Sequence, residues 1–434
     1  MESGNINKRV ASKVLNNLSK GTVPRVGAKY IAVGRKDEIE AFVTDLQDIE
    51  EGVGAFRIIS ARYGGGKSFM LNLMKDHALL KDYVVMNTQM GENYLFKGNR
   101  DVVMNLYGSL ITNTSIKGQP DGNGLETLLQ KWIDKVKKEV SKSTGYPPEN
   151  VPFSYVESAM RAKIDEMRNE PESSTFRRMI YGYAKAYNSS EDVEPFLKWF
   201  KGEYKTKSEL KDELGSNISM VTKENWFQYV RLWSEFVVDI GYKGLLVQFD
   251  EAQILSKLSK KKRIENYETL LRMFNSTIQD DVAHLGVYIC VIPETLDDKQ
   301  RGLYSYDALR TRIEPSIYQR PGDYSSGCVM TLKPLTNEEL FTLLDNICIL
   351  HEVKNGYDRR ISQEELIQYL NHVFGSIGAD EFLTPRALLK NFIAILDRLY
   401  KNPDESLSSI VGLIPMEDDI DPFDKQLDDF DLEI

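Results

Sequence analysis

Residues 61 to 68 read Ala-Arg-Tyr-Gly-Gly-Gly-Lys-Ser, between an apolar run that ends at Ser60 and an apolar stretch that starts at Phe69. A strand, a glycine-rich loop, a Lys-Ser pair and a helix in this order are typical of a phosphate-binding loop. The backbone N–H groups of such a loop can surround the phosphates of a nucleotide. The sequence therefore predicts nucleotide chemistry here, although Ala61 stands where the strict pattern has glycine.

The residues of the loop have separate tasks in this chemistry. The Lys67 ammonium is expected to reach the outer phosphates, and the Ser68 hydroxyl is expected to coordinate Mg²⁺. The residues that we expect around the nucleotide at this loop are Gly64, Gly65, Gly66, Lys67, Ser68 and Phe69. The predicted ligands are therefore ATP and Mg²⁺.

Two acids, Asp250 and Glu251, follow the apolar run 244–249. A carboxylate at the end of a buried strand is what Mg²⁺ requires from the second half of such a site, so we expect Asp250 opposite Ser68. Glu251 can orient or deprotonate the water that attacks the γ-phosphate. Together with the loop, these acids predict that ATP is hydrolysed as well as bound.

Thr295 and two arginines are further candidates for the reaction. Thr295 follows the apolar run 286–292, where a polar group can either sense the γ-phosphate or cap the strand end. Arg310 or Arg312 can act as an arginine finger on the nucleotide of a neighbouring subunit, and the sequence does not separate the two. The arginine finger would require a homo-oligomer.

Arg386 falls in the first turn of a predicted helix that has Thr384 as its N-cap and Pro385 at its first position. A cation in the first turn is unfavourable for the helix dipole. Its presence there indicates that Arg386 faces an anion, which we expect to be the bound phosphates.

Strands are expected at the apolar runs 56–60, 83–86, 244–249, 286–292 and 329–332. Helix-patterned segments separate these runs, which predicts an α/β fold with a doubly wound parallel sheet. Ligands of such sheets bind at the C-terminal ends of the strands, where the glycine loop and the two acids lie.

The chain divides into four predicted parts. We expect an N-terminal helical segment over 1–50, a P-loop ATPase core over 51–332, a helical lid over 333–400 and an acidic disordered tail over 401–434. The core is longer than a compact P-loop fold needs, and its residues from about 117 to 242 are patterned for helices. We therefore expect a large helical insertion in the core.

The composition excludes several classes of protein. An apolar fraction of 41% and a charged fraction of 28% are those of a globular protein, and no apolar run is long enough to span a membrane. The three cysteines are scattered and the four histidines isolated, which disfavours disulfides, histidine metal sites and Ser-His-Asp chemistry. We expect a cytoplasmic protein. Of the net charge of −10, residues 417–434 carry −8.

The order of these motifs resembles that of AAA+ ATPases, in particular the initiator and STAND branches. More narrowly, the segments 18–24, 33–35 and 63–68, with Pro293-Glu294 and 305–309, resemble the BREX-type ATP-binding proteins (BrxD-like), which include the ATPase of Shango-like antiphage systems. The resemblance covers residues 8 to about 400. It implies that Val33 and Gly34 lie near the adenine, that Arg386 is the nucleotide sensor of the lid, and that a helicase or TerB-like protein of the same operon is the partner.

The loop and the sequence Asp-Glu-Ala-Gln at 250–253 also resemble the first two motifs of superfamily 2 helicases. The later motifs of those helicases are absent from the sequence. Only 183 residues follow Glu251, and they are mostly helix-patterned, so a second RecA-like lobe does not fit. A helicase-like protein therefore remains the lesser alternative.

Two lysine-rich segments are candidate DNA contacts. The segment Lys198–Lys211 interleaves lysines with aromatic residues, and the segment Lys257–Arg263 carries five basic residues. Lysines that neutralise phosphates and aromatics that stack on bases hold nucleic acids without reading their sequence. The alternative is a solvated charged face over a helical core. Two functions stay open: an oligomeric ATPase motor on DNA, and a slow nucleotide-dependent switch that docks a partner, for which the acidic tail is a candidate.

Overall fold

The computed structural model describes residues 6–24, 26–166, 172–279, 284–316, 318, 322, 324, 327–375 and 384–411. Most of the predicted acidic tail, from residue 412 onward, lies outside the described residues.

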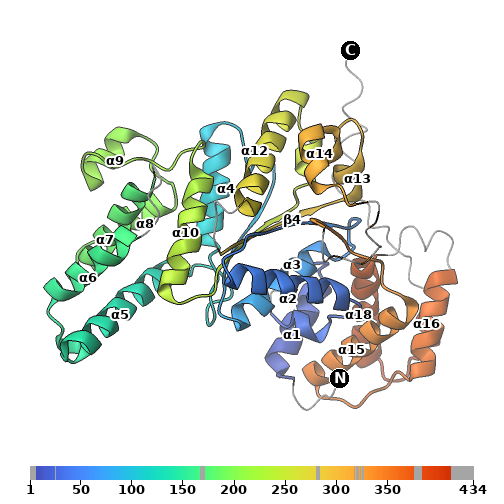
Figure 1. Cartoon of the computed structure of the whole chain (residues 1–434). Coiled ribbons are helices and arrows are strands. Elements are labelled where there is room, and N and C mark those ends of the chain that lie inside the picture. Colours follow the sequence, from blue (N-terminus) through green and yellow to red (C-terminus); the bar gives the residue numbers. More distant parts are fainter. Residues whose placement is uncertain are drawn as a thin grey trace.

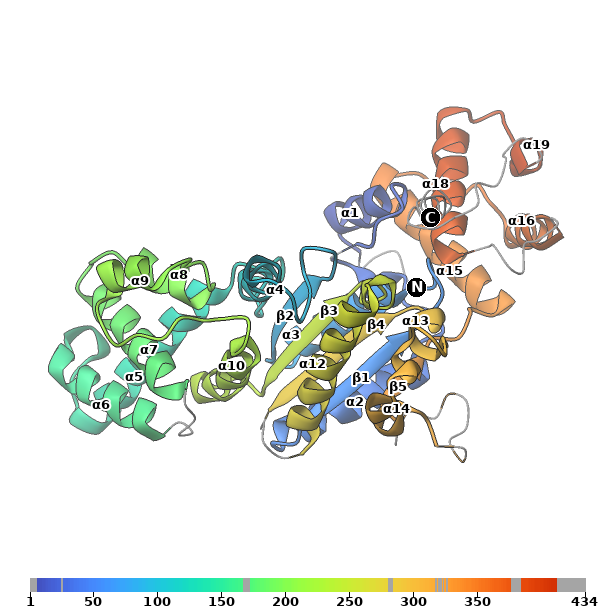
Figure 2. The same ribbon diagram turned by 90° about the horizontal axis from the view of Figure 1, so that it is seen from above.

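A five-stranded parallel sheet forms the centre of the molecule (Figures 1 and 2). Its strands are β1 (Ala55–Ser60), β2 (Val84–Gln89), β3 (Leu245–Asp250), β4 (Leu285–Val291) and β5 (Val329–Thr331). They pair in the order β2-β3-β4-β1-β5, and every pair is parallel. The predicted α/β fold with a parallel sheet is confirmed, and the C-terminal ends of β1 and β3 lie on the same edge.

Both faces of the sheet are covered by helices, as the continuous burial of β1 and β4 requires. On one face, α2 (Lys36–Glu50) and α3 (Lys67–Leu80) pack against alternate strand residues such as Ile59 and Leu246. On the other face, α4 (Arg100–Thr112), α10 (Trp226–Ile240) and α12 (Lys260–Ile278) pack against residues such as Ile58 and Val247. The sheet therefore separates two apolar cores.

The segment between α4 and β3 is helical and extends away from the sheet before α10 returns to it (Figure 2). It contains α5 (Leu125–Thr144), the 3-10 turn Pro148–Asn150, α6 (Phe153–Glu166), α7 (Ser173–Asn188), α8 (Glu194–Phe200), α9 (Lys207–Leu214) and α10. Its described residues include no strand, and its centre is aromatic, with the Phe176 ring 5.1 Å from that of Trp233. The exact limits of the insertion stay a prediction.

Short helices follow β3 and β4 at the C-terminal edge. They are α11 (Ile254–Lys257), α13 (Pro293–Asp297), the 3-10 turn Leu303–Ser305 and α14 (Asp307–Ile313).

The helices after β5 form a third core together with the first helix of the chain. These are α15 (Asn337–Asn355), α16 (Gln363–Gly375), α18 (Pro385–Lys401) and α19 (Leu407–Val411), and α1 (Lys8–Leu18) packs against α15 and α18. The predicted N-terminal segment contributes to two cores, because α1 packs with the helices after β5 and α2 packs on the sheet. The limits of the four predicted parts and the role of the helices after β5 as a lid stay predictions. The described helices include none that is both long and apolar enough to cross a membrane.

Candidate functional site

The glycine loop joins β1 to α3, and two of its glycines adopt a left-handed backbone. Gly64 has φ 69° and Gly66, the N-cap of α3, has φ 97°. A Cβ atom at Gly64 would lie 2.7 Å from Cβ of Thr384, at the start of α18. Glycine is therefore required at position 64 both by the turn and by the close approach of α18.

Ala61 departs from the strict loop pattern without a conformational cost. It does not have the positive φ of its glycine neighbours, and its methyl group is buried in the core between the sheet and α3. An alanine is therefore compatible with the first position of this loop.

Lys67 and Ser68 open α3 and face Asp250, the last residue of β3, and Glu251, which follows it. The Lys67 ammonium donates hydrogen bonds to the carbonyl oxygens of Ala61, at 2.9 Å, and Arg62, at 3.2 Å. Burial lowers the pKa of Lys67 against the opposing effect of the nearby acids. The Ser68 hydroxyl donates to Oδ2 of Asp250 at 2.5 Å, so the predicted pair of metal ligands is in direct contact.

Glu251 lies beside Asp250 in a left-handed backbone conformation with φ 59°. Burial raises the pKa of its carboxyl group, and the adjacent Asp250 adds to this. Its Oε2 accepts a hydrogen bond from the Nε2 of Gln253, a residue that the sequence analysis did not single out. Gln253 is itself only 7% exposed, and its Oε1 has no hydrogen-bond partner.

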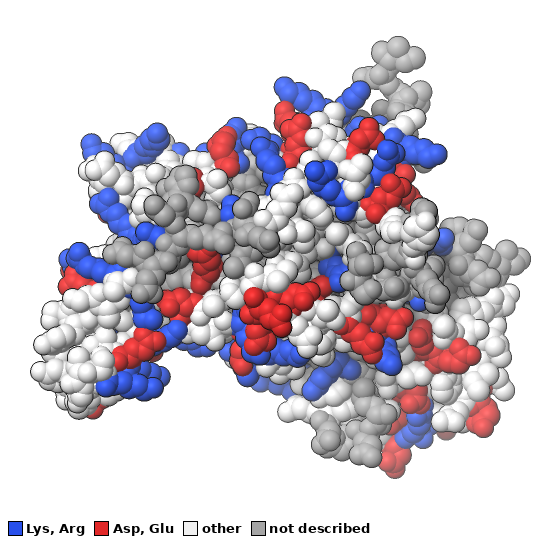
Figure 3. All heavy atoms as spheres, in the orientation of Figure 1, with Lys and Arg blue, Asp and Glu red and all other residues white. Residues whose placement is uncertain are grey.

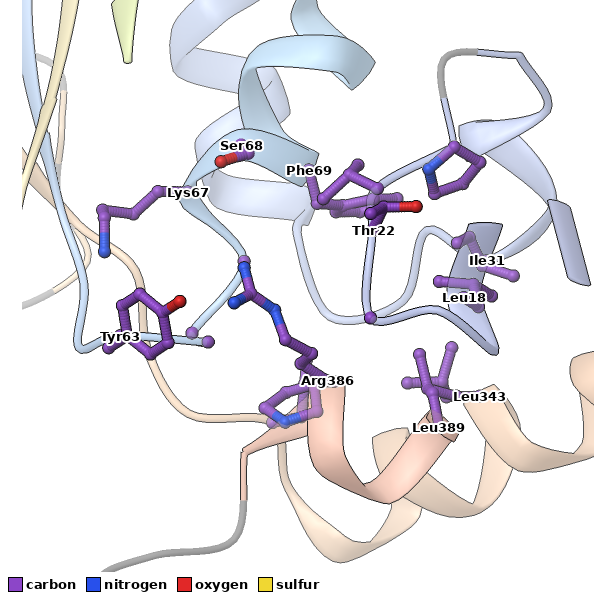
Figure 4. Close-up of a pocket in the computed structure, with 18 of the residues that line it drawn as sticks. Leu18, Thr22, Ile31, Tyr63, Lys67, Ser68, Phe69, Leu343, Arg386 and Leu389 are labelled. Atoms are coloured by element: carbon purple, nitrogen blue, oxygen red, sulfur yellow. The ribbon is translucent and has the colours of Figure 1, made fainter. Parts of the chain in front are cut away.

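A cavity extends from the loop to the helices after β5, with about 860 Å³ of empty space that includes open solvent (Figure 4). Its polar end is formed by the loop, Glu251 and Arg386. Its opposite end is apolar and is lined by Leu18, Ile31, Val33, Leu335, Leu343 and Leu389. The division into polar and apolar ends suits a nucleotide with its base among the leucines.

Arg386 reaches from the first turn of α18 toward the loop (Figure 4), and its predicted contact with the bound phosphates stays a prediction. Its guanidinium carbon lies 4.8 Å from the centre of the Tyr63 ring. Arg35 also lines the cavity, is 5% exposed and donates from Nη1 to the carbonyl oxygen of Lys333 at 2.8 Å. Arg35 belongs to the segment 33–35 that carries the family resemblance, but its place in the cavity was not predicted from the sequence.

Val33 and Gly34, which the resemblance placed near the adenine, have different surroundings. Val33 lines the apolar end of the cavity, whereas Gly34 is not among the lining residues. A Cβ at Gly34 would lie 2.4 Å from the carboxyl carbon of Glu339, whose side chain closes the capping box of α15. The glycine at position 34 is thus explained by packing against the lid.

Thr295, Arg310 and Arg312 are not brought to the cavity. Thr295 is fully buried, and its hydroxyl lies 3.1 Å from that of Ser256. On α14, Arg310 pairs with Asp307 at 3.1 Å, and Arg312 donates to Oδ1 of Asn275 at 3.0 Å. Their roles as sensor and arginine finger stay predictions.

The prediction that aromatic residues of the segment Lys198–Lys211 stack on bases is wrong. Trp199, Phe200 and Tyr204 are at most 2% exposed and belong to the core of the insertion, so they are closed to stacking on bases. Lys198 is paired with Glu213 at 2.7 Å and with Glu209 at 2.9 Å. The interleaved pattern reflects the buried side of α8 and of the stretch that leads into α9.

The second basic segment keeps three exposed lysines, Lys260, Lys261 and Lys262, at the start of α12. Arg263 is 8% exposed and donates hydrogen bonds to the carbonyl oxygens of Leu258 and Gln300. Arg263 is therefore a structural residue. On the face shown in Figure 3, basic and acidic side chains are scattered in mixed groups between uncharged areas.

The residues at the loop fit both predicted ligands. A hydroxyl and a carboxylate oxygen are donors of the kind that Mg²⁺ takes, and phosphate oxygens usually complete its shell. Within the described ranges, no group of three or more His, Cys, Asp or Glu side chains is arranged to hold a metal ion. A Mg²⁺ ion at Ser68 and Asp250 would therefore need phosphate oxygens as further ligands. The N-terminus of α3 supplies backbone N–H groups for the phosphates.

One family model and one solved structure are similar to this chain. A search of curated proteins gave no match. A solved structure, the Walker-type ATPase PABY2304 of Pyrococcus abyssi, aligns with a TM-score of 0.36 and 13% identity, over 86% of this chain and 69% of that chain. A family model described as "BREX system ATP-binding protein BrxC/D" matches residues 6–414. The chain therefore belongs to the BrxC/D family of ATP-binding proteins of the BREX antiphage system.

Proposed function

We propose that the protein binds ATP together with Mg²⁺ in the cavity between the sheet and the lid, and hydrolyses it to ADP and phosphate. One observation carries the proposal: the glycine loop, Glu251 and Arg386 of α18 converge on a single cavity with an apolar far end, and Asp250 contacts Ser68 of the loop. In this proposal the base lies among the leucines, and the phosphates lie along the loop.

Lys67 changes its hydrogen-bond partners when the nucleotide binds. Its ammonium donates to two loop carbonyls in the structure, at 2.9 and 3.2 Å. A phosphate oxygen is a stronger acceptor for a charged donor than a carbonyl oxygen. We therefore expect Lys67 to turn toward the phosphates, which also offsets the unfavourable burial of its charge.

Ser68 and Asp250 would hold Mg²⁺, which supplies neutralisation of the negative charge on the outer phosphates. Without the ion, the two side chains satisfy each other through the hydrogen bond of 2.5 Å.

Glu251 acts as the general base. Its carboxylate takes a proton from water while the water oxygen bonds to the γ-phosphorus and the bond to the ADP oxygen breaks. A carboxyl group whose pKa is raised by burial and by Asp250 is a better proton acceptor than an exposed glutamate. Gln253 holds this carboxylate through one of its two oxygens.

Two substitutions separate binding from hydrolysis. Lys67→Ala should weaken the binding of a fluorescent ATP analogue, because the only lysine at the loop is lost. Glu251→Gln should keep that binding and lower turnover by about 100-fold or more, as expected for loss of a general base. Glu294→Gln removes an exposed acid at the end of β4 and serves as the matched control. Turnover of Glu251→Gln at the wild-type rate would overturn the proposal.

We further propose that the ATPase is a homo-oligomer that contacts DNA and acts with a helicase or TerB-like partner. Arg310 and Arg312 are exposed on α14 and lie outside the cavity, which leaves them available to the nucleotide of another subunit. Lys260, Lys261 and Lys262 offer a basic surface near the same edge. Turnover per subunit should rise with protein concentration and with DNA, and Arg310→Ala or Arg312→Ala should abolish the rise.

The second candidate is a slow switch whose nucleotide state controls the docking of a partner. The observation that favours it is the resting arrangement of the site, in which Lys67 and Glu251 are both engaged by neighbouring groups. Slow turnover that is independent of protein concentration and DNA would support the switch and refute the motor.

A further inference from the structure

A second cavity, of about 1280 Å³ and partly open to solvent, adjoins the nucleotide cavity. Ser68 and Val23 line both cavities and separate them. From Ser68 and Asp250, the second cavity runs between α3 and the strands β2 and β3, toward the segment after α4.

The walls of this cavity are polar where a helix normally packs on a sheet through apolar side chains. On α3, Ser68, Asn72 and Lys75 follow the helical spacing i, i+4, i+7 and so share one side of the helix. Three apolar residues at this spacing would have made an ordinary helix–sheet contact. The spacing therefore indicates a hydrated channel.

The opposing strands continue the same pattern. Asn87 of β2 is paired in register with Gln248 of β3, and Gln89 is paired with Asp250. Residues two apart on a strand lie on one face of the sheet, so these four polar side chains form a contiguous group under α3. Gln248 is only 2% exposed and donates to the carbonyl oxygen of Leu71 at 3.0 Å.

One buried cation lies along the channel. Lys75 is 3% exposed, its ammonium donates to the carbonyl oxygen of Pro120 at 3.2 Å, and it follows Ser68 by two helical turns, which is about 10 Å. The carboxylates that line the channel are Asp250, at the metal end, and Asp121, which is exposed. The remaining polar lining consists of uncharged amides and hydroxyls, which can donate hydrogen bonds to an anion.

We propose that this channel is the exit path and transient binding site for the inorganic phosphate released from ATP, a proposal that rests on the proposed hydrolysis. The γ-phosphate would lie beside Lys67 and Ser68, at the point where the two cavities meet. ADP and the lid, with Arg386 and Leu389, would fill the other cavity. Phosphate that leaves past Ser68 toward Lys75 therefore leaves without prior opening of the lid.

The test compares variants of the channel with matched controls in the full chain. Lys75→Met removes the cation at similar length, and Lys81→Met removes an exposed lysine just after the same helix. Asn72→Leu blocks the channel at a partly exposed position, with Asn105→Leu, at an exposed position on α4, as its control.

Two rates are measured in a single turnover: ATP cleavage by chemical quench, and phosphate release with a fluorescent phosphate-binding protein. We expect Lys75→Met and Asn72→Leu to slow release by about tenfold, the worth of one charge-assisted hydrogen bond, while cleavage is unchanged. Equal rates of release in variants and controls, or equal slowing of cleavage and release, would overturn the proposal. No cleavage by the wild-type protein would instead refute the proposed hydrolysis.

A binding measurement does not depend on turnover. Inorganic phosphate is titrated into the ADP-bound protein and followed by ³¹P NMR, and we expect Lys75→Met to bind it about tenfold more weakly than wild type and Lys81→Met. Equal phosphate affinity in all three proteins would refute the phosphate site. If Lys75→Met changed the affinity for Mg²⁺ and left the affinity for phosphate unchanged, the channel would be a binding site for hydrated metal. That result would also refute the phosphate site.

Discussion

Replacement of Gln253 by leucine should change the pH dependence of ATP hydrolysis while the fold stays intact. Gln253 donates a hydrogen bond to Oε2 of Glu251, and this bond favours the charged carboxylate. Burial and Asp250 act in the opposite direction and raise the pKa of Glu251. Without the amide, only the neighbouring cations would still oppose that rise.

The size of the effect follows from the strength of the lost bond. A hydrogen bond to a charged group contributes about 1.5 to 3 kcal/mol, and one pKa unit corresponds to about 1.4 kcal/mol. Because Glu251 is partly exposed, the lower figure applies, and the pKa of Glu251 should rise by roughly one unit. The base is active when deprotonated, so the acid limb of the kcat profile should move upward by roughly one pH unit.

The assay is steady-state ATP turnover at saturating ATP and Mg²⁺ from pH 5 to pH 9, with Gln47→Leu on the exposed side of α2 as the control. The free energy of unfolding of Gln253→Leu should stay close to that of wild type, because the substitution also removes a buried oxygen, Oε1 of Gln253, that has no partner. An acid limb at the wild-type position, in a variant of wild-type stability, would refute the role of Gln253.

Three further predictions concern the fold around the site. Arg57→Met should lower the free energy of unfolding by about 3 to 5 kcal/mol in a urea titration, because it leaves the Asp45 carboxylate buried without its cation, Nη2 of Arg57 at 2.6 Å from Oδ1 of Asp45. The double variant Arg57→Met with Asp45→Leu should recover part of this loss. Gly64→Ala should weaken ATP-analogue binding by about tenfold or more, since a methyl group meets Thr384 at 2.7 Å and φ is positive; unchanged affinity would show that α18 does not pack here in solution. Asp76→Asn should raise the free energy of unfolding by roughly 1 to 2 kcal/mol at pH 8, because burial raises the pKa of Asp76 from 3.8 to about 6 and so disfavours its charged form. This gain should vanish as the pH falls from about 6 to 4, where Asp76 becomes neutral in both the folded and the unfolded protein. A gain that persists at pH 4 would contradict this cause.

The sequence predicted the parts of the site that lie within short contiguous motifs. The loop and the two acids are contiguous motifs, and the structure brings Ser68 and Asp250 into contact as predicted. Arg386 was found from a local conflict between its charge and the helix dipole, and it does line the cavity.

The apolar end of the cavity was largely missed because no local pattern marks it. Leu18, Ile31, Leu335 and Leu389 come from four separate segments, and Leu18 and Leu389 are also ordinary core residues by the periodicity of their helices. The error at Trp199 has a related cause. Lysines and aromatics that alternate along a chain describe a nucleic-acid surface and an amphipathic helix equally well, and only burial separates the two.

The shared core of α1 and the lid helices has a consequence for how the protein would respond to a ligand. Since α1 packs with α15 and α18, a displacement of α18 relative to the sheet must carry α1 with it. Leu18 of α1 and Leu389 of α18 then move together relative to the glycine loop. A bound nucleotide that contacts all three would therefore hold α1 and α18 in place on the sheet together. A truncation that removes α1 would therefore loosen the lid and open the base pocket, although it leaves every residue of the loop in place.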